Sequence, residues 1–261
     1  MEPVEGARSF QTSGDAYDAF MGRYSRQLAH LVAEAAAIVP GLRAVDIGCG
    51  PGALTSVLVE RLGPAGVSAC DPSPPFVDDC SARHPGVDIR IGRAEGIPFD
   101  DGTFDRAIAQ LVLHFVSDVP AAMAEMQRVL KPGGRAAACV WADGGQEMLT
   151  RFWEAARVVD PDARNEVMRF GLEGELTEVF ESAGFADVSE TTLGVRSTYE
   201  DFDELWSGYL QGVGPAGAFC RALPEPKQAE VRRVLFERLG SPTGSLTLRA
   251  VSRFVSGTAP D

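Results

Sequence analysis

Residues 45–53 combine a carboxylate with glycines at alternate positions. The segment reads Val-Asp-Ile-Gly-Cys-Gly-Pro-Gly-Ala, closes an apolar run that predicts a strand, and opens a helical stretch. Glycines let the backbone approach a ligand closely and adopt φ angles closed to other residues, while the first turn of a helix offers unpaired N–H groups. The segment is typical of a turn that holds a nucleotide-like ligand, although a tight strand-to-helix turn also needs glycine for structural reasons.

A second carboxylate, Asp71, closes the next apolar run about 20 residues beyond this turn, at the spacing of a ribose-binding acid. There it can accept hydrogen bonds from both ribose hydroxyls, and the spacing predicts a nucleoside. Asp71 is alternatively a turn or helix-capping residue before Pro72.

Asp46 separates two kinds of nucleoside ligand. In the dinucleotide fingerprint a third glycine follows the second by three residues; position 53 here is Ala53, which some such sites accept. Spacing therefore does not decide. Asp46 lies two residues before Gly48, where its charge would repel a diphosphate and attract an ammonium or sulfonium group. The turn favours a cationic ligand.

Five segments, in this order, resemble the class I S-adenosylmethionine-dependent methyltransferases, within them the group similar to the ubiquinone/menaquinone biosynthesis methyltransferases (methyltransferase type 11). The segments are VDIGCGPGALT, ACDPSPPFV, GRAEGIPFDDGTFD, AQLVLHFVSD and MQRVLKPGGR, and they cover about residues 41 to 141. The resemblance implies an enzyme with S-adenosylmethionine as cofactor and S-adenosylhomocysteine as product. Because the reactive methyl group travels with the cofactor, no metal is expected.

The resemblance also implies which residues contact the cofactor. It assigns Asp46 and the loop of Gly48, Cys49, Gly50 and Gly52 to the methionine moiety, Asp71 with Pro72 to the ribose, Ala94 and Glu95 to the adenine edge, and Gln110 and Leu111 to the methionine amine. Two features depart from the family. Arg93 stands where such proteins commonly carry an aspartate for the adenine amine. Residues 74–76, Pro-Pro-Phe, resemble a motif of base-methylating enzymes, but they follow the second strand instead of the fourth, and we interpret them as a loop.

Related enzymes fold the segment before the sheet over the cofactor, so the resemblance adds Tyr17, Arg23 and Tyr24 to the cofactor site. Arg23 is a candidate partner for the methionine carboxylate, and a tyrosine could close the pocket. A solvated arginine and core tyrosines remain the alternative.

His114 follows the fourth predicted strand, near the place where the family's substrate meets the methyl group. We consider it as a general base that accepts a proton from a hydroxyl or an acidic carbon. The alternative is a partly buried histidine bonded to a backbone carbonyl. For the substrate pocket, Trp141, Trp206 and Tyr209 are candidates, although packing of a helical segment onto the core explains these aromatic residues equally well.

Short apolar runs alternate with helical stretches, which predicts the frame for these residues. The fold class is α/β: a Rossmann-like, seven-stranded, mostly parallel sheet with helices on both faces, N-terminal helices and an inserted helical lid. Strands are expected at 43–47, 66–69, 87–91, 104–109, 134–140, 185–195 and 245–255; helices are expected within 16–39 and at 53–62, 119–130, 147–159 and 173–183.

Four regions follow from this frame. Residues 1–40 form an N-terminal helical cap, 41–198 the methyltransferase core, 199–240 the inserted lid, and 241–261 the last strand of the core and a tail. The lid is expected to cover the carboxyl ends of the strands, where ligands of open α/β sheets bind.

The composition restricts the classes of partner and the compartment that we expect for this chain. The net charge of −13 should repel a polyanion, which disfavours nucleic acid. No apolar run suits a membrane span and the first residues lack a secretory pattern, so no membrane association and a cytoplasmic location are expected. Five scattered cysteines suggest neither a disulfide framework nor a zinc site, and those at 49, 70 and 139 suit small buried residues.

A methyltransferase of a small-molecule metabolite is therefore the leading hypothesis. A methyltransferase of protein or RNA is the second, and a non-catalytic S-adenosylmethionine-binding protein is the third. The substrate, the atom methylated and the oligomeric state are left open by the sequence.

Overall fold

The computed structural model describes residues 22–165, 169–212 and 214–260, which form two compact units. The core unit comprises Ser25–Trp141, Arg169–Leu193 and the described residues of Ser252–Asp261. The helical unit comprises the described residues of Met1–Tyr24, Ala142–Met168 and Gly194–Val251. Tyr17, a predicted cofactor contact, lies outside the described residues.

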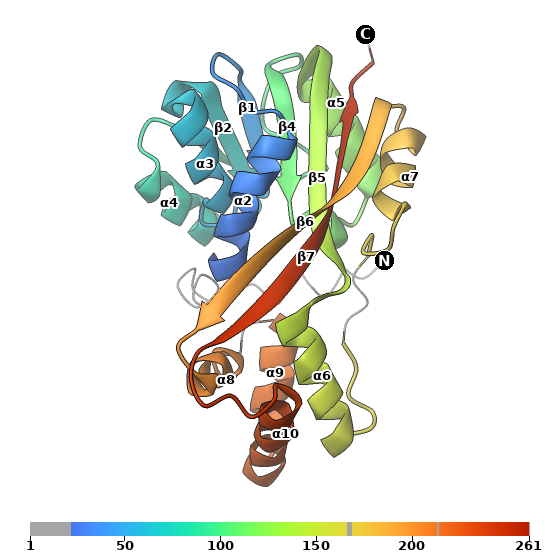
Figure 1. The fold of residues 1–261 in the computed structure, drawn as a ribbon. Helices are drawn as coiled ribbons and strands as arrows, with labels where there is room; N and C mark the ends of the chain where they lie inside the picture. The colour runs from blue at the N-terminus through green and yellow to red at the C-terminus, as the bar shows by residue number, and fades with distance from the viewer. Residues whose placement is uncertain (1–21, 166–168, 213, 261) are drawn as a thin grey trace. The chain divides into compact units, whose positions relative to one another are not determined.

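Seven strands of the described chain form one sheet in the order β3-β2-β1-β4-β5-β7-β6 (Figure 1). They are β1 (Ala44–Ile47), β2 (Val67–Asp71), β3 (Asp88–Ile91), β4 (Phe104–Gln110), β5 (Leu130–Gln146), β6 (Ala186–Tyr199) and β7 (Leu246–Thr258). The pairs β1–β2, β1–β4, β2–β3 and β4–β5 are parallel, and the arrow of β7 is opposed to that of β4 (Figure 1). The predicted seven-stranded, mostly parallel α/β fold is confirmed.

The inner strands are buried on both faces, since every residue of β1 and β2 is buried. Near-continuous apolar runs are typical of such parallel strands. The register pairs Asp46 of β1 with Ala69 of β2 and with Ile108 of β4. The carboxyl ends of these three strands therefore lie side by side, and they carry the predicted site residues.

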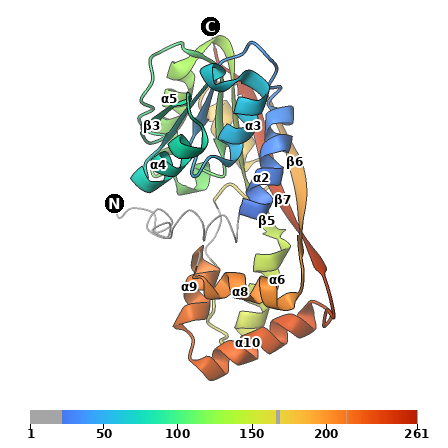
Figure 2. The same ribbon diagram turned by 90° about the vertical axis from the view of Figure 1, so that its left-hand side faces the viewer.

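Helices cover both faces of this sheet. Helices α2 (Arg23–Ala35) and α3 (Ala53–Leu62) lie on one face, and α5 (Val119–Val129) and α7 (Glu175–Ser182) lie on the other (Figures 1 and 2). Apolar side chains of α5 and α7, among them Met123, Met126 and Phe180, pack in one buried cluster with alternate residues of β4 and β5. A 3₁₀ turn, η4 (Leu113–Phe115), leads from β4 toward α5.

The helical unit has a core of its own. It contains α6 (Glu147–Val159), α8 (Phe202–Leu210), α9 (Gly214–Ala222) and α10 (Glu225–Arg238), and α10 packs on α6. Phe152 of α6 stacks on Tyr209 of α8 with ring centroids 4.5 Å apart. Strands β5, β6 and β7 each belong partly to this unit and partly to the core unit.

Four elements differ from the sequence-based expectation: α4, β5, and the strands β6 and β7, which end at Tyr199 and Thr258 instead of 195 and 255. Strand β5 also ends later than expected, at Gln146 instead of 140. The Pro-Pro-Phe segment interpreted as a loop opens a helix, α4 (Pro74–Arg83), because proline is tolerated in the first helical turn, where its missing N–H group has no helical partner. Strand β5 starts at Leu130, before the predicted 134, because Leu130 pairs with Phe104 across an irregularity in the β4 register.

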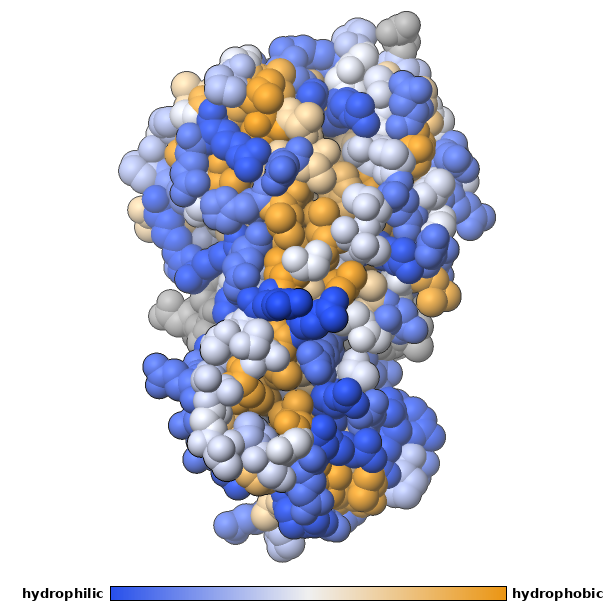
Figure 3. All heavy atoms as spheres, in the orientation of Figure 1, coloured by the Kyte–Doolittle hydropathy of each residue, from blue (hydrophilic) through white to orange (hydrophobic). Residues whose placement is uncertain are grey.

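Among the described residues, the exposed large apolar side chains are few and separate in sequence; they are Val39, Ile91, Val158, Leu172 and Leu210. Figure 3 shows hydrophilic side chains over much of the visible surface, with a strip of apolar residues over β5 and β7. Among the described helices, none combines the length and hydropathy needed to cross a bilayer.

Candidate functional site

The glycine loop, residues 48–52, turns the chain from β1 into α3. The backbone N–H groups of Gly48 and Cys49 donate to the Cys70 carbonyl at 2.8 and 3.0 Å. Its three glycines, Gly48, Gly50 and Gly52, have positive φ angles of 71°, 52° and 98°. A Cβ at position 48 would lie 2.5 Å from the Val112 side chain, whereas one at position 50 would meet no atom within 4 Å. The loop is therefore packed from behind at Gly48 and faces open space at Gly50.

Asp71 ends β2 with a carboxylate that is almost fully buried. Its Oδ2 accepts a hydrogen bond from the Gly50 N–H at 2.9 Å, and its Oδ1 accepts one from the Ser73 N–H at 2.8 Å, across Pro72. Burial raises the pKa of Asp71, and the two N–H groups oppose that rise. The turn-forming alternative is thus present, and it leaves each oxygen a second lone pair for another donor.

Asp46 is 1% exposed and lies on β1 just before the glycine loop. Thr55 Oγ1 donates to its Oδ2 at 2.7 Å. Burial raises the pKa of Asp46 to about 7; the Thr55 hydroxyl opposes this shift and the nearby Asp71 carboxylate adds to it. The charge of Asp46 is therefore expected to change near neutral pH.

Gln110 and Leu111 lie at the carboxyl end of β4, beside β1. The Gln110 Nε2 donates to the Ser25 carbonyl of α2 at 3.1 Å, but its Oε1 is buried without a hydrogen-bond partner in the described structure. Leu111 has a φ of 61°, an uncommon left-handed conformation for a leucine. A buried acceptor without a donor is costly, so this oxygen suits a ligand N–H group.

The predicted adenine contacts lie beyond β3. Ala94 is buried, and the Glu95 carboxylate accepts a hydrogen bond from the Ser117 N–H at 3.1 Å. Arg93, the departure from the family pattern, forms an ion pair with Glu95 at 3.5 Å. Burial alone would raise the pKa of Glu95, but backbone N–H groups and Arg93 hold it below its ordinary value.

His114 lies in η4 and is 6% exposed. Its Nδ1 is buried and has no hydrogen-bond partner among the described residues, so the expected bond to a backbone carbonyl is absent at this atom. Burial, with the positive charge of Arg169, lowers the pKa of His114 to about 3. The imidazole is therefore neutral at physiological pH.

Comparisons with known proteins bear on the family and the fold. Residues 45–138 match the family described as a methyltransferase domain. The malonyl-[acyl-carrier protein] O-methyltransferase of Herminiimonas arsenicoxydans is 29% identical over 252 residues, which cover 95% of this chain and 93% of the relative. The biotin biosynthesis bifunctional protein BioHC of Cellvibrio japonicus is 30% identical over 243 residues, which cover 91% of this chain and 47% of the relative.

A solved structure of a putative type II methyltransferase from Anaeromyxobacter dehalogenans shares the fold, with a TM-score of 0.67, 24% identity, and coverage of 90% of this chain and 96% of that chain. Residues 45–138 thus form a methyltransferase domain, and these relatives support the class I S-adenosylmethionine-dependent methyltransferase family for the chain. The cofactor of this methyltransferase family is S-adenosylmethionine, as the resemblance implied. The chain spans about half the length of several curated relatives that it matches.

The remaining predicted cofactor contacts among the described residues, Arg23 and Tyr24, lie in the helical unit. Arg23 forms an ion pair with Glu204 and places its guanidinium 4.1 Å from the centre of the Tyr199 ring. The Tyr24 hydroxyl lies 3.2 Å from the Tyr199 hydroxyl. Arg23 is therefore not a solvated arginine, and Tyr24 is a core tyrosine; their cofactor contacts stay a prediction.

The predicted substrate residues are buried side chains. The Tyr209 hydroxyl donates to the Met148 carbonyl at 2.8 Å. The ring centroids of Trp206 and Tyr209 lie 6.0 Å apart. Trp141, 3% exposed, belongs to the core unit. These contacts match the packing alternative for Trp206 and Tyr209, and the substrate role of all three residues stays a prediction.

Several residues that hold the glycine loop were missed from the sequence. The Arg83 Nη1 donates to the Pro51 carbonyl at 3.1 Å, and a Cβ at position 52 would lie 2.9 Å from both Cys80 Sγ and His84 Nε2. These three residues belong to α4 or follow it directly, and they were missed because the Pro-Pro-Phe segment that opens this helix was interpreted as a loop. Thr55 was missed although its place in the first turn of the predicted helix was a usable signal.

The cysteines at 49, 70 and 139 are buried, as expected, and so are the other two. Burial raises the pKa of Cys70 and of Cys139 to about 12. Within the described residues, no group of three or more His, Cys, Asp or Glu side chains could hold a metal ion.

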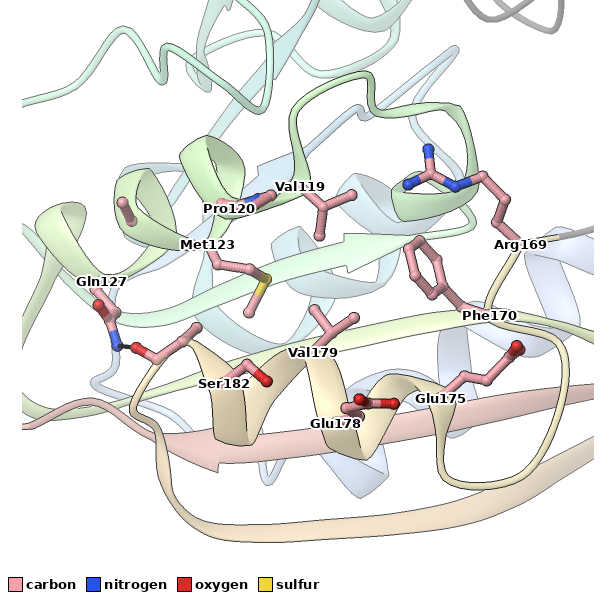
Figure 4. Close-up of a pocket in the computed structure, with 12 residues that line it drawn as sticks. Val119, Pro120, Met123, Gln127, Arg169, Phe170, Glu175, Glu178, Val179 and Ser182 are labelled. Atoms are coloured by element: carbon pink, nitrogen blue, oxygen red, sulfur yellow. Dashed lines mark hydrogen bonds between the residues drawn. The ribbon is translucent and has the colours of Figure 1, made fainter.

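A separate cavity of about 580 Å³ lies between α5 and α7 (Figure 4). Met123 and Val179 point toward each other across its centre, while Glu175 and Glu178 line the α7 side. None of the predicted cofactor or substrate residues lines this cavity.

Proposed function

We propose that this chain transfers the methyl group of S-adenosylmethionine to a small-molecule nucleophile, with the cofactor bound across the carboxyl ends of β1, β2 and β4. One observation carries the proposal. Open space before Gly50, the Asp46 and Asp71 carboxylates and the unsatisfied Gln110 Oε1 all belong to adjoining strand ends. A cationic amino acid joined to a nucleoside matches this combination of acceptors.

The residues divide the cofactor between them. Gln110 Oε1 would accept a hydrogen bond from the methionine ammonium, with the Asp46 charge attracting both positive groups. Asp71 would accept the ribose hydroxyls with the lone pairs that Gly50 and Ser73 leave available. Ala94 and Glu95 would line the adenine edge.

The bound cofactor supplies a methyl group on a positively charged sulfur, which a nucleophile displaces in line. The protein has to orient the nucleophile and exclude water. His114 supports this role as a neutral imidazole with an unsatisfied Nδ1. It would accept a hydrogen bond from a substrate O–H or N–H group and so point that atom at the methyl group.

Small molecules are the substrate class that we favour, with protein or RNA second. The relative from Herminiimonas arsenicoxydans, which aligns along nearly the whole chain, is named for an acyl group carried on a protein, so a carboxylate of an acyl thioester joins the candidates. The net charge of −13 opposes an RNA substrate. A protein that binds S-adenosylmethionine without catalysis is the third alternative.

The test is a transfer assay with S-adenosylmethionine labelled in the methyl group. The panel contains phenols, amines, carboxylic acids, a malonyl thioester, a bulk protein fraction and total RNA, and S-adenosylhomocysteine release is followed in parallel. Label in a small-molecule fraction together with stoichiometric S-adenosylhomocysteine supports the proposal. Label in protein or RNA alone would overturn the substrate class, and tight cofactor binding without turnover on any fraction would favour the non-catalytic alternative.

A further inference from the structure

Thr55 is fully buried in the first turn of α3, behind the glycine loop. Its hydroxyl donates to Asp46 Oδ2 at 2.7 Å, and its backbone N–H also bonds Asp46. The Cys80 thiol of α4 donates in turn to Thr55 Oγ1 at 3.7 Å. Because that oxygen receives the thiol proton, the hydroxyl proton is directed to the carboxylate.

Asp46 has few other sources of stabilisation for its charge. The two hydrogen bonds that oppose its burial both come from Thr55. Among the residues that the structure describes, the titratable groups facing it are another carboxylate, Asp71, and four thiols, those of Cys49, Cys70, Cys80 and Cys139. Asp71 repels a second negative charge. Burial raises the pKa of Cys70 and Cys139, and the hydrogen bond with Cys80 together with burial raises that of Cys49, so these three thiols are neutral at physiological pH. The hydrogen bond with Cys49 lowers the pKa of Cys80, but a thiol in either protonation state carries no positive charge that could stabilise Asp46.

We propose that Thr55 is a positioning residue of the cofactor site: its hydroxyl keeps the Asp46 carboxylate charged and fixed in direction, so that the carboxylate attracts the cationic cofactor at neutral pH. The inference rests on the proposed function, because it needs the cofactor beside Asp46. Loss of the hydroxyl makes ionisation of Asp46 harder, and a neutral Asp46 attracts the sulfonium less.

A structural role is the competing explanation. The N-cap residue of α3, Gly52, has no side chain that could accept an N–H group of the first helical turn. Asp46 accepts the Thr55 N–H instead, so the pair could serve only to stabilise the start of the helix. In that case, loss of the Thr55 hydroxyl would lower the stability of the fold and would reduce the affinity for S-adenosylmethionine by the same factor at every pH.

The experiment measures the dissociation constant of S-adenosylmethionine by calorimetry between pH 5.5 and 9. For the unmodified chain, affinity should rise with pH around a midpoint near 7, since the pKa of Asp46 is raised to about 7 and only its charged form attracts the ligand. Thr55→Val should move this midpoint upward, so that affinity falls about tenfold at pH 7 and recovers by pH 9. Thr55→Ala removes the same hydroxyl with less bulk and replaces the valine variant if that does not fold.

Three controls fix the interpretation. Thr55→Ser keeps the hydroxyl and should behave like the unmodified chain, and Asp46→Asn should flatten the pH dependence. Thr103→Val, outside the glycine loop, removes a hydroxyl that donates to the Asp100 carbonyl. This variant should leave the affinity and its pH dependence unchanged.

The outcomes distinguish the role of Thr55 from the proposed function of the chain. An equal loss at every pH in Thr55→Val, or an unmoved midpoint, overturns the role of Thr55 while the proposed function stands. Absence of S-adenosylmethionine binding by the unmodified chain at any pH overturns the proposed function itself.

Discussion

At the scale of single residues, Asp46 and Asp71 are both buried carboxylates, yet their partners differ. Asp71 accepts hydrogen bonds from backbone N–H groups of the glycine loop and of the turn after β2, whereas Thr55 is the one residue of the described chain that donates to Asp46. Asp71 is therefore part of the loop's own hydrogen bonding as well as a candidate ribose acceptor. A substitution has to remove the ribose acceptor while it disturbs the loop as little as possible.

Asp71→Asn meets this requirement, because the amide keeps the shape of the side chain and one acceptor oxygen. We expect S-adenosylmethionine to bind about 10- to 100-fold more weakly, since hydrogen bonds to a charged acceptor contribute about 1.5–3 kcal/mol. Calorimetric titration measures the change. Asp88→Asn, at an exposed carboxylate paired with Arg90, is the matched control and should bind normally. An unchanged constant in the folded Asp71→Asn variant would rule out the ribose assignment.

His114 gives a prediction about stability against pH. Its pKa is about 3 in the fold and 6.5 as the ordinary value, so between these values the unfolded chain binds a proton that the folded chain does not. The stability of the fold therefore does not suffer from His114 above pH 6.5, where the imidazole is neutral in both states, and it falls as the pH decreases below that value. His114→Phe abolishes this loss, so on going from pH 7.5 to 5 the variant should gain up to about 2 kcal/mol relative to the unmodified chain.

Chemical denaturation at the two pH values measures this difference. Asp46, with its raised pKa, acts in the opposite sense over part of the same range, but it is present in both proteins and cancels in the comparison. A difference between variant and unmodified chain that does not change with pH would contradict the burial of a neutral His114.

At the scale of elements, α4 and the glycine loop form one packed assembly. Gly52→Ala would drive a methyl group against Cys80 and His84 at a φ of 98°, and we expect a stability loss of about 2–4 kcal/mol from crowding and strain together. Gly50→Ala meets open space, so we expect only the strain of a left-handed alanine, about 1–2 kcal/mol, together with loss of cofactor binding.

Gly102→Ala separates strain from ligand contact. This glycine has a similar φ of 59°, also faces open space, and lies in a turn after β3 and outside the glycine loop. It should lose about as much stability as Gly50→Ala and bind S-adenosylmethionine normally. Thermal unfolding and calorimetry on the three variants check the expectation; normal binding by Gly50→Ala would show that the ligand does not occupy the space before the loop.

Elements with a single dominant signal were predictable from the sequence. The continuous apolar runs of β1, β2 and β4 and the periodic patterns of α3, α5 and α6 gave bounds within two residues of those in the structure. Helix α4 was not predictable in this way, because Pro74 and Pro75 are typical of both a turn and a helix start, and its apolar face is short. The early start of β5 depends on pairing with Phe104, which local sequence does not encode.

The candidate site divides along the same line. Residues on strand ends, such as Asp46, Asp71 and Gln110, were assigned from spacing and from the family resemblance. Residues that act through another residue were not: Thr55 and Cys80 matter because α3 and α4 pack together, which is a tertiary relation. Arg93 shows the limit of the resemblance, since it stands where the family commonly has an aspartate and forms an ion pair with Glu95.

At the scale of the whole molecule, one sheet serves two units. The core unit holds the predicted cofactor contacts from Asp46 to Leu111 together with His114, while the described residues at 23, 24, 206 and 209 belong to the helical unit. Three strands belong to both units. That residues 199–240 close over a bound substrate stays a prediction.

We propose that the site at the carboxyl ends of β1, β2 and β4 binds S-adenosylmethionine and not a dinucleotide. Calorimetric titration of the unmodified chain with S-adenosylmethionine, S-adenosylhomocysteine and NAD, repeated with Gly50→Ala, tests it most directly. We expect the unmodified chain to bind one equivalent of S-adenosylmethionine or S-adenosylhomocysteine, Gly50→Ala to bind neither, and NAD to give no heat. Saturable binding of NAD with none of S-adenosylmethionine would contradict it.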